Sequence, residues 1–154
     1  AWVDGVDTWD DWFKPEFHVV QNRGIGLIAQ GSEDWTDYTI STNASVPLAE
    51  SAGVAARIGG MRRYYALVLR AGDKAQLVKC INERTVLAEA EVPWEVDAKY
   101  DFSLTVDGNT LRGTVAGVTL EATDDDHPLR GGAAGLVVEV GALEAGEITV
   151  RPNA

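Results

Sequence analysis

Cysteine is almost absent from this chain, because Cys80 is the only one among 154 residues. A single thiol cannot form an intramolecular disulfide, and it cannot supply a cysteine-rich zinc site. Glycine-rich phosphate-binding motifs are missing, and no apolar run approaches the roughly 18 to 20 residues that cross a bilayer as a helix. These absences exclude a disulfide framework, a thiolate zinc centre and a membrane-spanning helix.

Basic residues are scarce: 13 Lys and Arg stand against 24 Asp and Glu, which gives a formal net charge of -11. Such a field repels phosphate backbones and anionic lipid heads. Apart from the run Asp124-Asp125-Asp126, the acids are scattered, as is typical of a solvated surface. We therefore expect neither a nucleic acid nor a membrane as a partner.

The length and composition indicate one globular domain. A chain of 154 residues can bury a core without a metal or a disulfide, and its 16 glycines suit many tight turns. It begins at Ala1 without an initiator methionine, so we expect a processed chain or a domain excised from a longer multidomain protein. We predict a single domain over 1–154, with a Trp-rich N-terminal segment (1–16) followed by a sandwich (17–151).

Apolar and polar residues alternate along much of the chain, whereas no sustained helical period occurs. In the clearest run, 99–106, Tyr100, Phe102, Leu104 and Val106 alternate with polar residues. Short turn signals such as 107–109 and 116–117 separate the runs and predict a three-strand meander there. The other predicted strands are 18–22, 25–30, 36–46, 53–58, 63–70, 75–81, 85–92, 134–140 and 147–151. The stretch 6–13 is helix-prone or a loop.

This pattern predicts an all-β fold, a two-sheet antiparallel jelly-roll sandwich. The segments WTDYTIS, GVAARIGGMRRYYALVL, YDFSLTVDGNTLRGTVAGVTLEATD and RGGAAGLVVE follow one another in an order that resembles concanavalin A-like lectin/glucanase and laminin-G-like domains. The resemblance covers roughly residues 17 to 151.

A narrower resemblance rests on WVDGVDTWDDW, QNRGIGLIAQG, RRYYALVLRAGDKAQLVK, VLAE and PLRGG. These segments look like the C-terminal accessory domain of bacterial ADP-ribosylglycohydrolase-family proteins. The hydrolase chemistry of that family belongs to a separate helical domain with paired magnesium ions, so the resemblance does not carry the activity to this chain. It implies an accessory role and, by analogy of fold, carbohydrate binding.

Basic and aromatic side chains on neighbouring predicted strands form the first candidate ligand site: Arg57, Arg63, Tyr64 and Lys79. Aromatic faces together with guanidinium or ammonium donors suit sugar hydroxyls, carboxylates or phosphates. Whether these residues share one face depends on strand register. The alternative is that the long basic side chains only lie along a half-buried sheet face.

Trp35 and Glu139 complete the predicted ligand-binding set. The Trp35 ring could stack on a sugar from a loop, or it could plug the end of the core. Glu139 interrupts the apolar strand GLVVEVG, where it could accept from a ligand hydroxyl or form an ion pair across the sheet.

Neither catalysis nor metal binding finds a suitable motif. A glycanase of this fold needs paired carboxylates on one strand face, and Pro93 and Trp94 interrupt the only dense candidate, EAEVPWEVD. The stretch 124–127 is rich in carboxylates, but its spacing does not support a structural calcium ion. We predict no catalytic residue, no metal ligand and no cofactor.

We therefore expect a non-catalytic module that binds a carbohydrate or ribosyl ligand and accompanies a glycohydrolase-type catalytic domain. The alternative is a structural or protein-interaction domain that docks on a catalytic domain or dimerises through a sheet face. A glycan hydrolase is a minor third alternative. The sequence does not identify the ligand, the oligomeric state or the cellular compartment.

Overall fold

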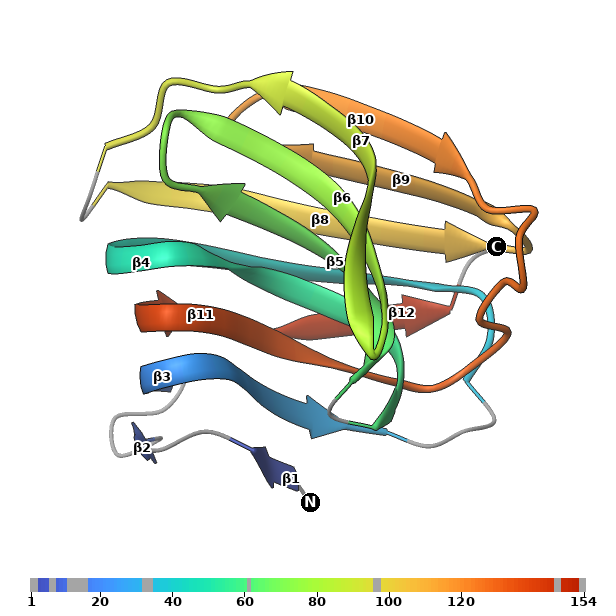
Figure 1. Ribbon diagram of the computed structural model, residues 1–154, viewed down its shortest axis with the longest axis horizontal. Helices are drawn as coiled ribbons and strands as arrows, with labels where there is room; N and C mark the ends of the chain where they lie inside the picture. The colour runs from blue at the N-terminus through green and yellow to red at the C-terminus, as the bar shows by residue number, and fades with distance from the viewer. Residues whose placement is uncertain are drawn as a thin grey trace.

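The fold was analysed in a computed structural model, which describes residues 3–5, 8–10, 17–31, 35–60, 62–95, 98–145 and 148–152. These residues form an all-β structure (Figure 1). Its strands are β1 (Val3–Gly5), β2 (Thr8–Asp10), β3 (Phe17–Gln30), β4 (Tyr38–Gly60), β5 (Arg63–Arg70), β6 (Lys74–Ile81), β7 (Glu83–Glu91), β8 (Lys99–Asp107), β9 (Thr110–Val115), β10 (Val118–Thr123), β11 (Ala133–Ala145) and β12 (Thr149–Pro152).

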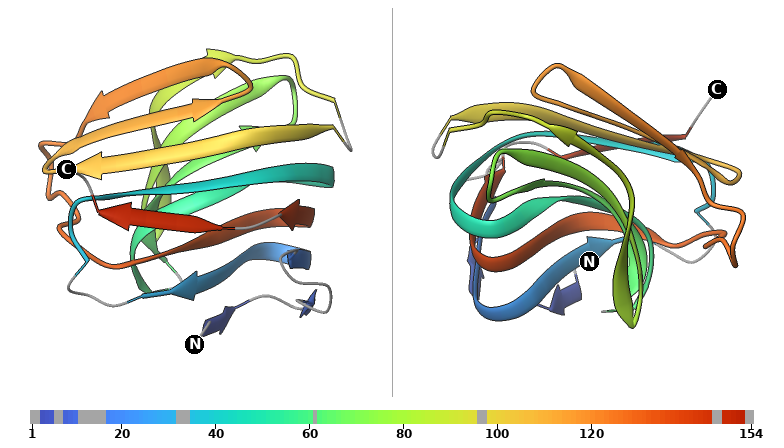
Figure 2. Two further views of the ribbon diagram at one scale, coloured as in Figure 1. Left: turned by 180° about the vertical axis from the view of Figure 1, so that it is seen from behind. Right: turned by 45° about the horizontal axis from the view of Figure 1, so that its top comes forward.

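The strands build two antiparallel layers that share β4 (Figures 1 and 2). In one layer, β1 and β2 border β3, and the order continues through β11, the C-terminal part of β4, β5 and β6 to β7. In the other layer, the N-terminal part of β4 lies between β12 and β8, and β9 and β10 follow β8. The predicted all-β jelly-roll sandwich is confirmed.

The principal core lies between the two layers. The alternation predicted for β8 is confirmed, since Phe102, Leu104 and Val106 are buried while Asp101 and Asp107 are exposed. Facing side chains from the first layer include Leu67 and Leu77. One face of β8 therefore packs inward and the other is more accessible, as a two-layer sandwich requires.

A second apolar cluster covers the opposite face of the first layer. It includes Tyr64, Ala66 and Val68 of β5, with Val78 of β6 and Val137 of β11. Because both faces are buried, the central residues of β5 form a continuous buried run without alternation. This layer thus carries buried side chains on both faces.

The strand boundaries differ from the prediction where turn-forming residues lie inside long strands. We predicted separate strands at 36–46 and 53–58, but β4 runs continuously through Pro47. Its register with β11 shifts between the pairs Leu48–Ala142 and Ser45–Glu144, so Pro47 falls in an irregularity of the ladder, where a missing N–H is tolerated. The predicted strands 18–22 and 25–30 likewise merge into β3 across another register shift.

The N-terminal stretch contains strand rather than helix where it is described. The segment 6–13 was predicted to be helix-prone or a loop, and Thr8–Asp10 pairs with β3 as β2. The remainder of that segment lies outside the described residues. Among the residues that the structure describes, no helix of a length and apolarity suited to crossing a membrane is found.

Candidate functional site

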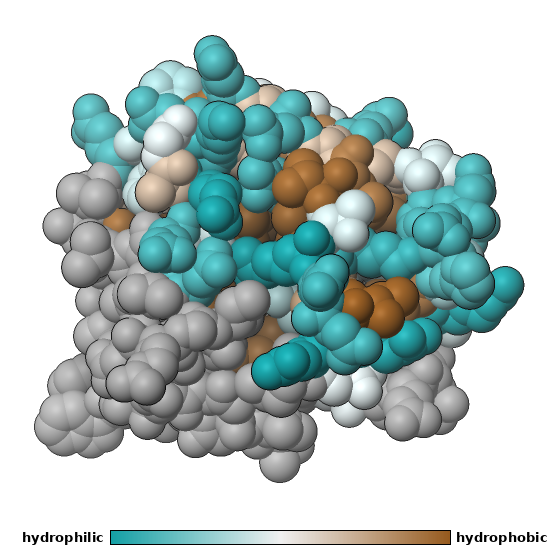
Figure 3. Space-filling view, viewed as in Figure 1, coloured by the Kyte–Doolittle hydropathy of each residue, from teal (hydrophilic) through white to brown (hydrophobic). Residues whose placement is uncertain are grey.

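A hollow of about 580 Å³ opens where β6 and β7 meet the segment that follows β10. Its lining combines apolar, cationic and anionic side chains: Arg63, Lys79, Ile81, Glu83, Thr85, Leu87, Asp124, Asp126 and His127. Among the residues coloured by hydropathy in Figure 3, apolar patches lie within a mainly hydrophilic surface. The volume lies within the range of about 300 to 1,000 Å³ that is usual for small-ligand sites.

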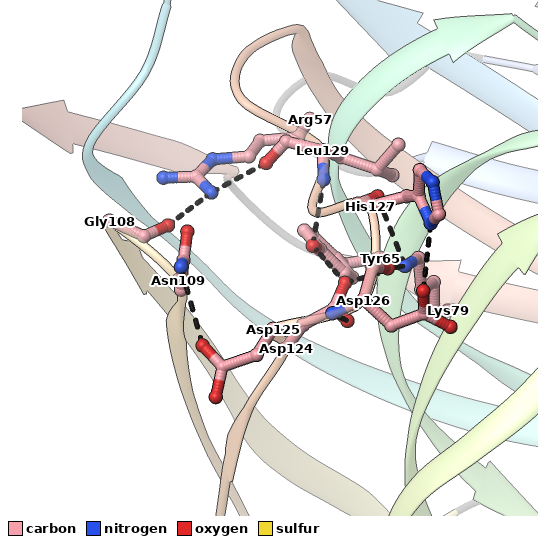
Figure 4. Close-up of polar contacts among 10 residues, drawn as sticks. All are labelled: Arg57, Tyr65, Lys79, Gly108, Asn109, Asp124, Asp125, Asp126, His127 and Leu129. Atoms are coloured by element: carbon pink, nitrogen blue, oxygen red, sulfur yellow. Dashed lines mark hydrogen bonds and ion pairs between the residues drawn. The ribbon is translucent and has the colours of Figure 1, made fainter.

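The pairing of β5 with β6 places the residues at the base of this hollow next to one another. Tyr65 of β5 lies opposite Lys79 of β6, and both side chains reach the Asp124 carboxylate (Figure 4). The Tyr65 hydroxyl donates to Asp124 Oδ2 at 2.6 Å, and Lys79 Nζ lies 2.8 Å from the same oxygen. Lys79 also donates to the carbonyls of Asp126 and His127. The ammonium thus ties β6 to the segment 124–127.

The ionisation of this buried group follows from its contacts. Burial alone would raise the pKa of Asp124, but hydrogen bonds from Lys79 and Tyr65 outweigh burial and hold that pKa below its ordinary value. Burial raises the pKa of the Tyr65 hydroxyl, and its hydrogen bond to Asp124 raises it further. Asp124 is therefore a carboxylate and Tyr65 a neutral donor at neutral pH.

Exposed side chains form the rim of the hollow. Arg63 and Glu83 are exposed where β5 and β7 begin, and the side chains of Asp126 and His127 are 93% and 91% exposed. His127 Nδ1 lies 2.7 Å from Asp126 Oδ1, and its backbone has a φ of 50°. The rim therefore offers a guanidinium donor and carboxylate acceptors to a ligand, above a partly apolar wall formed by Ile81 and Leu87.

Arg57 does not share this rim, because it is 2% exposed. It lies in β4 at a register irregularity between Ala56 and Gly60, with a φ of 50°. Its guanidinium donates to the carbonyls of Thr36, Gly108 and Leu129 and to Asp37 (Figure 4 shows two of these bonds). Arg57 thus holds three connecting segments together at one end of the sandwich.

Tyr64 is also buried, on the opposite face of the first layer from Lys79. Its hydroxyl accepts from Arg84, at 3.3 Å from Nη2. Burial raises the pKa of this hydroxyl despite the neighbouring Arg84. Of the four residues predicted to form one basic and aromatic cluster, the structure brings Arg63 and Lys79 to one hollow and places Arg57 and Tyr64 elsewhere.

Glu139 lies in a polar network near Tyr64. Its Oε1 is 3.1 Å from Arg70 and 3.5 Å from Arg84, and it accepts a hydrogen bond from Ser51 at 3.2 Å. The ion-pair alternative for Glu139 is therefore what the structure shows, with Arg70 and Arg84 as partners. Sequence reasoning did not identify Arg84, because its contact with Ser51 crosses several strands.

Trp35 lies apart from both groups, against a second hollow of about 400 Å³. Its ring packs edge-on against Tyr38, with ring centroids 5.9 Å apart. Trp35 is 37% exposed, so it does not simply fill the end of the core.

The segment 124–127 does not present its carboxylates as a metal site. Asp124 Oδ2 is bonded to Tyr65 and Lys79, and Asp124 Oδ1 accepts from the backbone N–H of Asp126. Within the described part of the chain, no group of three or more His, Cys, Asp or Glu residues is placed to hold a metal ion. The strand interruption predicted at Pro93 and Trp94 is present, since β7 ends at Glu91 and 92–95 are not in a strand.

Comparison with known proteins shows the fold. No protein-family model matches the chain, and no curated protein matches it. Among solved structures, the carbohydrate binding module CBM66 from Bacillus subtilis is similar with a TM-score of 0.85 and 19% identity, over 97% of this chain and 94% of that chain. A Bacillus subtilis protein of unknown function with a galectin-like fold has a TM-score of 0.69 and 13% identity, over 99% and 88%.

A mutant of the GH43 protein BlXynB from Bacillus licheniformis is similar over 99% of this chain but only 37% of its own length, with a TM-score of 0.71 and 12% identity. The resemblance to ADP-ribosylglycohydrolase-family proteins and to laminin-G-like domains finds no support among these matches. What the matches and the strand arrangement share is the architecture: this chain has the concanavalin A-like jelly-roll fold also found in CBM66.

Proposed function

We propose that this protein is a carbohydrate-binding module and that the hollow between β6, β7 and the segment 124–127 receives the sugar. The observation that carries the proposal is the lining of that hollow. An exposed guanidinium, exposed carboxylates and a partly apolar wall surround one space of about 580 Å³. Sugars present both hydroxyls and C–H faces, so they suit a site with this mixture.

The charges of the hollow favour a neutral sugar. Lys79 and Asp124 compensate each other as an ion pair at the base. The remaining formal charges are one positive charge on Arg63 and two negative charges on Glu83 and Asp126. Their sum is -1. A hydroxyl can accept from Arg63 and donate to Asp126 or Glu83, whereas a phosphate would meet the two carboxylates unfavourably. A neutral glycan is therefore favoured over a phosphate-bearing form of the ribosyl ligand, such as ADP-ribose.

An accessory role is the second part of the proposal. The sandwich of the GH43 protein that resembles this chain occupies about a third of that protein, so there it is one part of a longer chain. CBM66 is named a carbohydrate binding module and matches almost end to end. We infer that this chain accompanies a catalytic domain and brings that domain to its substrate.

Substituting Arg63 by alanine tests the site. We expect R63A to weaken binding to the best neutral glycan by roughly 10- to 100-fold, because a charge-assisted hydrogen bond is lost. The measurement is isothermal titration calorimetry, after a panel of xylan, levan, mixed-linkage β-glucan and ADP-ribose has been screened with the wild-type protein. R112A is the matched control, since Arg112 is an exposed arginine of β9 that pairs with Glu121 and does not line the hollow.

If R63A and the wild-type protein bound the glycan with equal affinity, the glycan would not bind in this hollow. If the protein bound ADP-ribose and none of the neutral glycans, the ribosyl alternative would be favoured. The preference of the hollow for a neutral sugar would then be contradicted. If the wild-type protein bound no ligand of the panel, carbohydrate binding would be contradicted. The structural or protein-interaction alternative would then be favoured.

A further inference from the structure

A second hollow, of about 400 Å³, is lined by Trp35, Thr36, Asp37, Tyr38, Val150 and Pro152. It shares no lining residue with the first hollow. We propose that it is a second sugar subsite, in which the Trp35 indole stacks on a neutral sugar ring of the same glycan. This inference rests on the proposed function and extends it from one contact point to two.

The Trp35 indole is exposed and yet fixed in orientation. Trp35 and Val86 are the exposed large hydrophobic residues in the part of the chain whose burial the structure describes. Tyr38 contacts the ring edge-on, with an interplanar angle of 72°. A Cβ added at Gly31 would lie 2.6 Å from the indole, so this glycine leaves just enough room for the ring.

The backbone of Trp35 is anchored as well, because the N–H of Gly132 donates to the Trp35 carbonyl at 2.9 Å. An aromatic ring that is already ordered loses little conformational freedom when a ligand stacks on it. Core packing alone does not account for a tryptophan that is more than a third accessible to solvent. A stacking surface accounts for both the order and the exposure.

Asp37 supplies a polar acceptor beside this ring. Its Oδ1 accepts from Arg57 Nη2 at 3.0 Å and from the N–H of Gly108 at 2.9 Å. Among the described residues, both hydrogen bonds to this side chain are accepted by Oδ1, so Oδ2 keeps its capacity to accept from a ligand hydroxyl. The side chain is 47% exposed, and the Arg57 guanidinium compensates its charge.

This charge balance selects the class of ligand. Because Arg57 neutralises much of the Asp37 charge, this carboxylate attracts a cation only weakly, and it still repels an anion. A hydroxyl next to an apolar C–H face fits both the Asp37 oxygen and the Trp35 ring. The same class of neutral sugar therefore suits both hollows.

One segment connects the two hollows. Lys79, at the base of the first, donates to the carbonyls of Asp126 and His127. Tyr38, in the wall of the second, donates to the carbonyl of Gly132. The segment 124–132 thus adjoins both sites, and a glycan chain that follows it would contact both. Two linked contacts raise the affinity for a polymer above that of either contact alone.

Affinity gel electrophoresis tests this inference, with soluble xylan, levan or mixed-linkage β-glucan cast in the gel as the probe. On the polysaccharide that retards the wild-type protein, we expect W35A to bind about tenfold more weakly, which is the loss expected for one aromatic contact. W35F keeps an aromatic ring and should lose only about threefold. V86A is the matched control, since Val86 is the other exposed large hydrophobic side chain and should give no change.

The outcomes separate the two proposals. If R63A loses affinity while W35A binds as tightly as wild type, the second subsite is wrong and the proposed function stands. If no polysaccharide retards the wild-type protein, both are wrong. Should thermal unfolding show that W35A is not folded, W35F decides, and its unchanged affinity would overturn the subsite. An equal loss for V86A would also overturn it, because the effect would not be specific to the indole.

Discussion

Replacing Arg57 by alanine is expected to lower the free energy of unfolding by about 3 to 5 kcal/mol. The guanidinium donates to three carbonyls, those of Thr36, Gly108 and Leu129, at 2.6 to 2.9 Å, and to Asp37 at 3.0 Å. Alanine removes every one of these donors and leaves buried carbonyl oxygens without partners, which is costly. Denaturation by guanidinium chloride, followed by tryptophan fluorescence, measures the change.

Two further variants make this result specific. R57K keeps the positive charge, but one ammonium cannot reproduce a planar fork that reaches three separate carbonyls, so we expect it to recover less than half of the loss. R112A removes an exposed arginine that pairs with Glu121, and it should cost no more than about 1 kcal/mol. An R57A protein as stable as R112A would show that Arg57 does not hold these segments together.

Replacing Asp124 by asparagine is expected to cost about 2 to 4 kcal/mol at pH 7, because Lys79 then loses its buried anionic partner. The cost should depend on pH. The folded-state pKa of Asp124 lies below its ordinary value of about 3.9, so the ionised group stabilises the fold above that pH. This stabilisation is lost as the pH falls through the folded-state pKa.

The measurement is urea unfolding of wild type and D124N between pH 7 and about pH 2.5. The difference in unfolding free energy should shrink towards the acid end, since wild-type Asp124 then becomes protonated too. D126N is the matched control, because the Asp126 side chain is 93% exposed and should change stability by less than about 0.5 kcal/mol. A difference between wild type and D124N that stays constant over this range would contradict the assigned ion pair.

The strands could be predicted from local sequence patterns wherever one face of the strand is buried and the other is exposed to solvent. The run 99–106 was predicted from alternation and a following turn signal, and β8 (Lys99–Asp107) extends only one residue further. The meander continues through β9 and β10 with the predicted turns. Alternation fails for β5, whose interior is buried on both faces, but its length and its flanking turns still indicated a strand.

The long strands were not predictable in the same way. Pro47 and Gly24 usually separate elements, and a single sequence does not say that a register shift will absorb them. The continuity of β4 arises from its pairing with β8 at one end and with β11 and β5 at the other. Those partners are distant in sequence, so the strand length depends on tertiary contacts.

The candidate site was predicted only in part, for a related reason. Arg63 and Lys79 belong to neighbouring strands, and their grouping needed only the register of β5 and β6. Tyr64 follows Arg63 directly and therefore points to the other face. Arg57 departs from the pattern because its positive φ turns the side chain away from the strand alternation.

Asp124 and Tyr65 were missed as a pair, although a signal existed. Tyr65 is the residue of β5 that lies opposite Lys79, and an acidic run follows β10. The hydrogen bond between them joins residues 59 positions apart. Only the closing of the second layer over the first brings that acidic run to the base of the hollow.

The most direct test of carbohydrate binding in the first hollow is a ¹H–¹⁵N nuclear magnetic resonance titration with the neutral oligosaccharide selected from the panel. We predict that the largest amide shifts fall on the residues of β7 and of the acidic segment 124–127 that line the hollow, namely Glu83, Thr85, Leu87, Asp124, Asp126 and His127. Shifts centred instead on Arg70 and Glu139, in the polar network of the opposite face, would contradict this assignment, as would the absence of any shift.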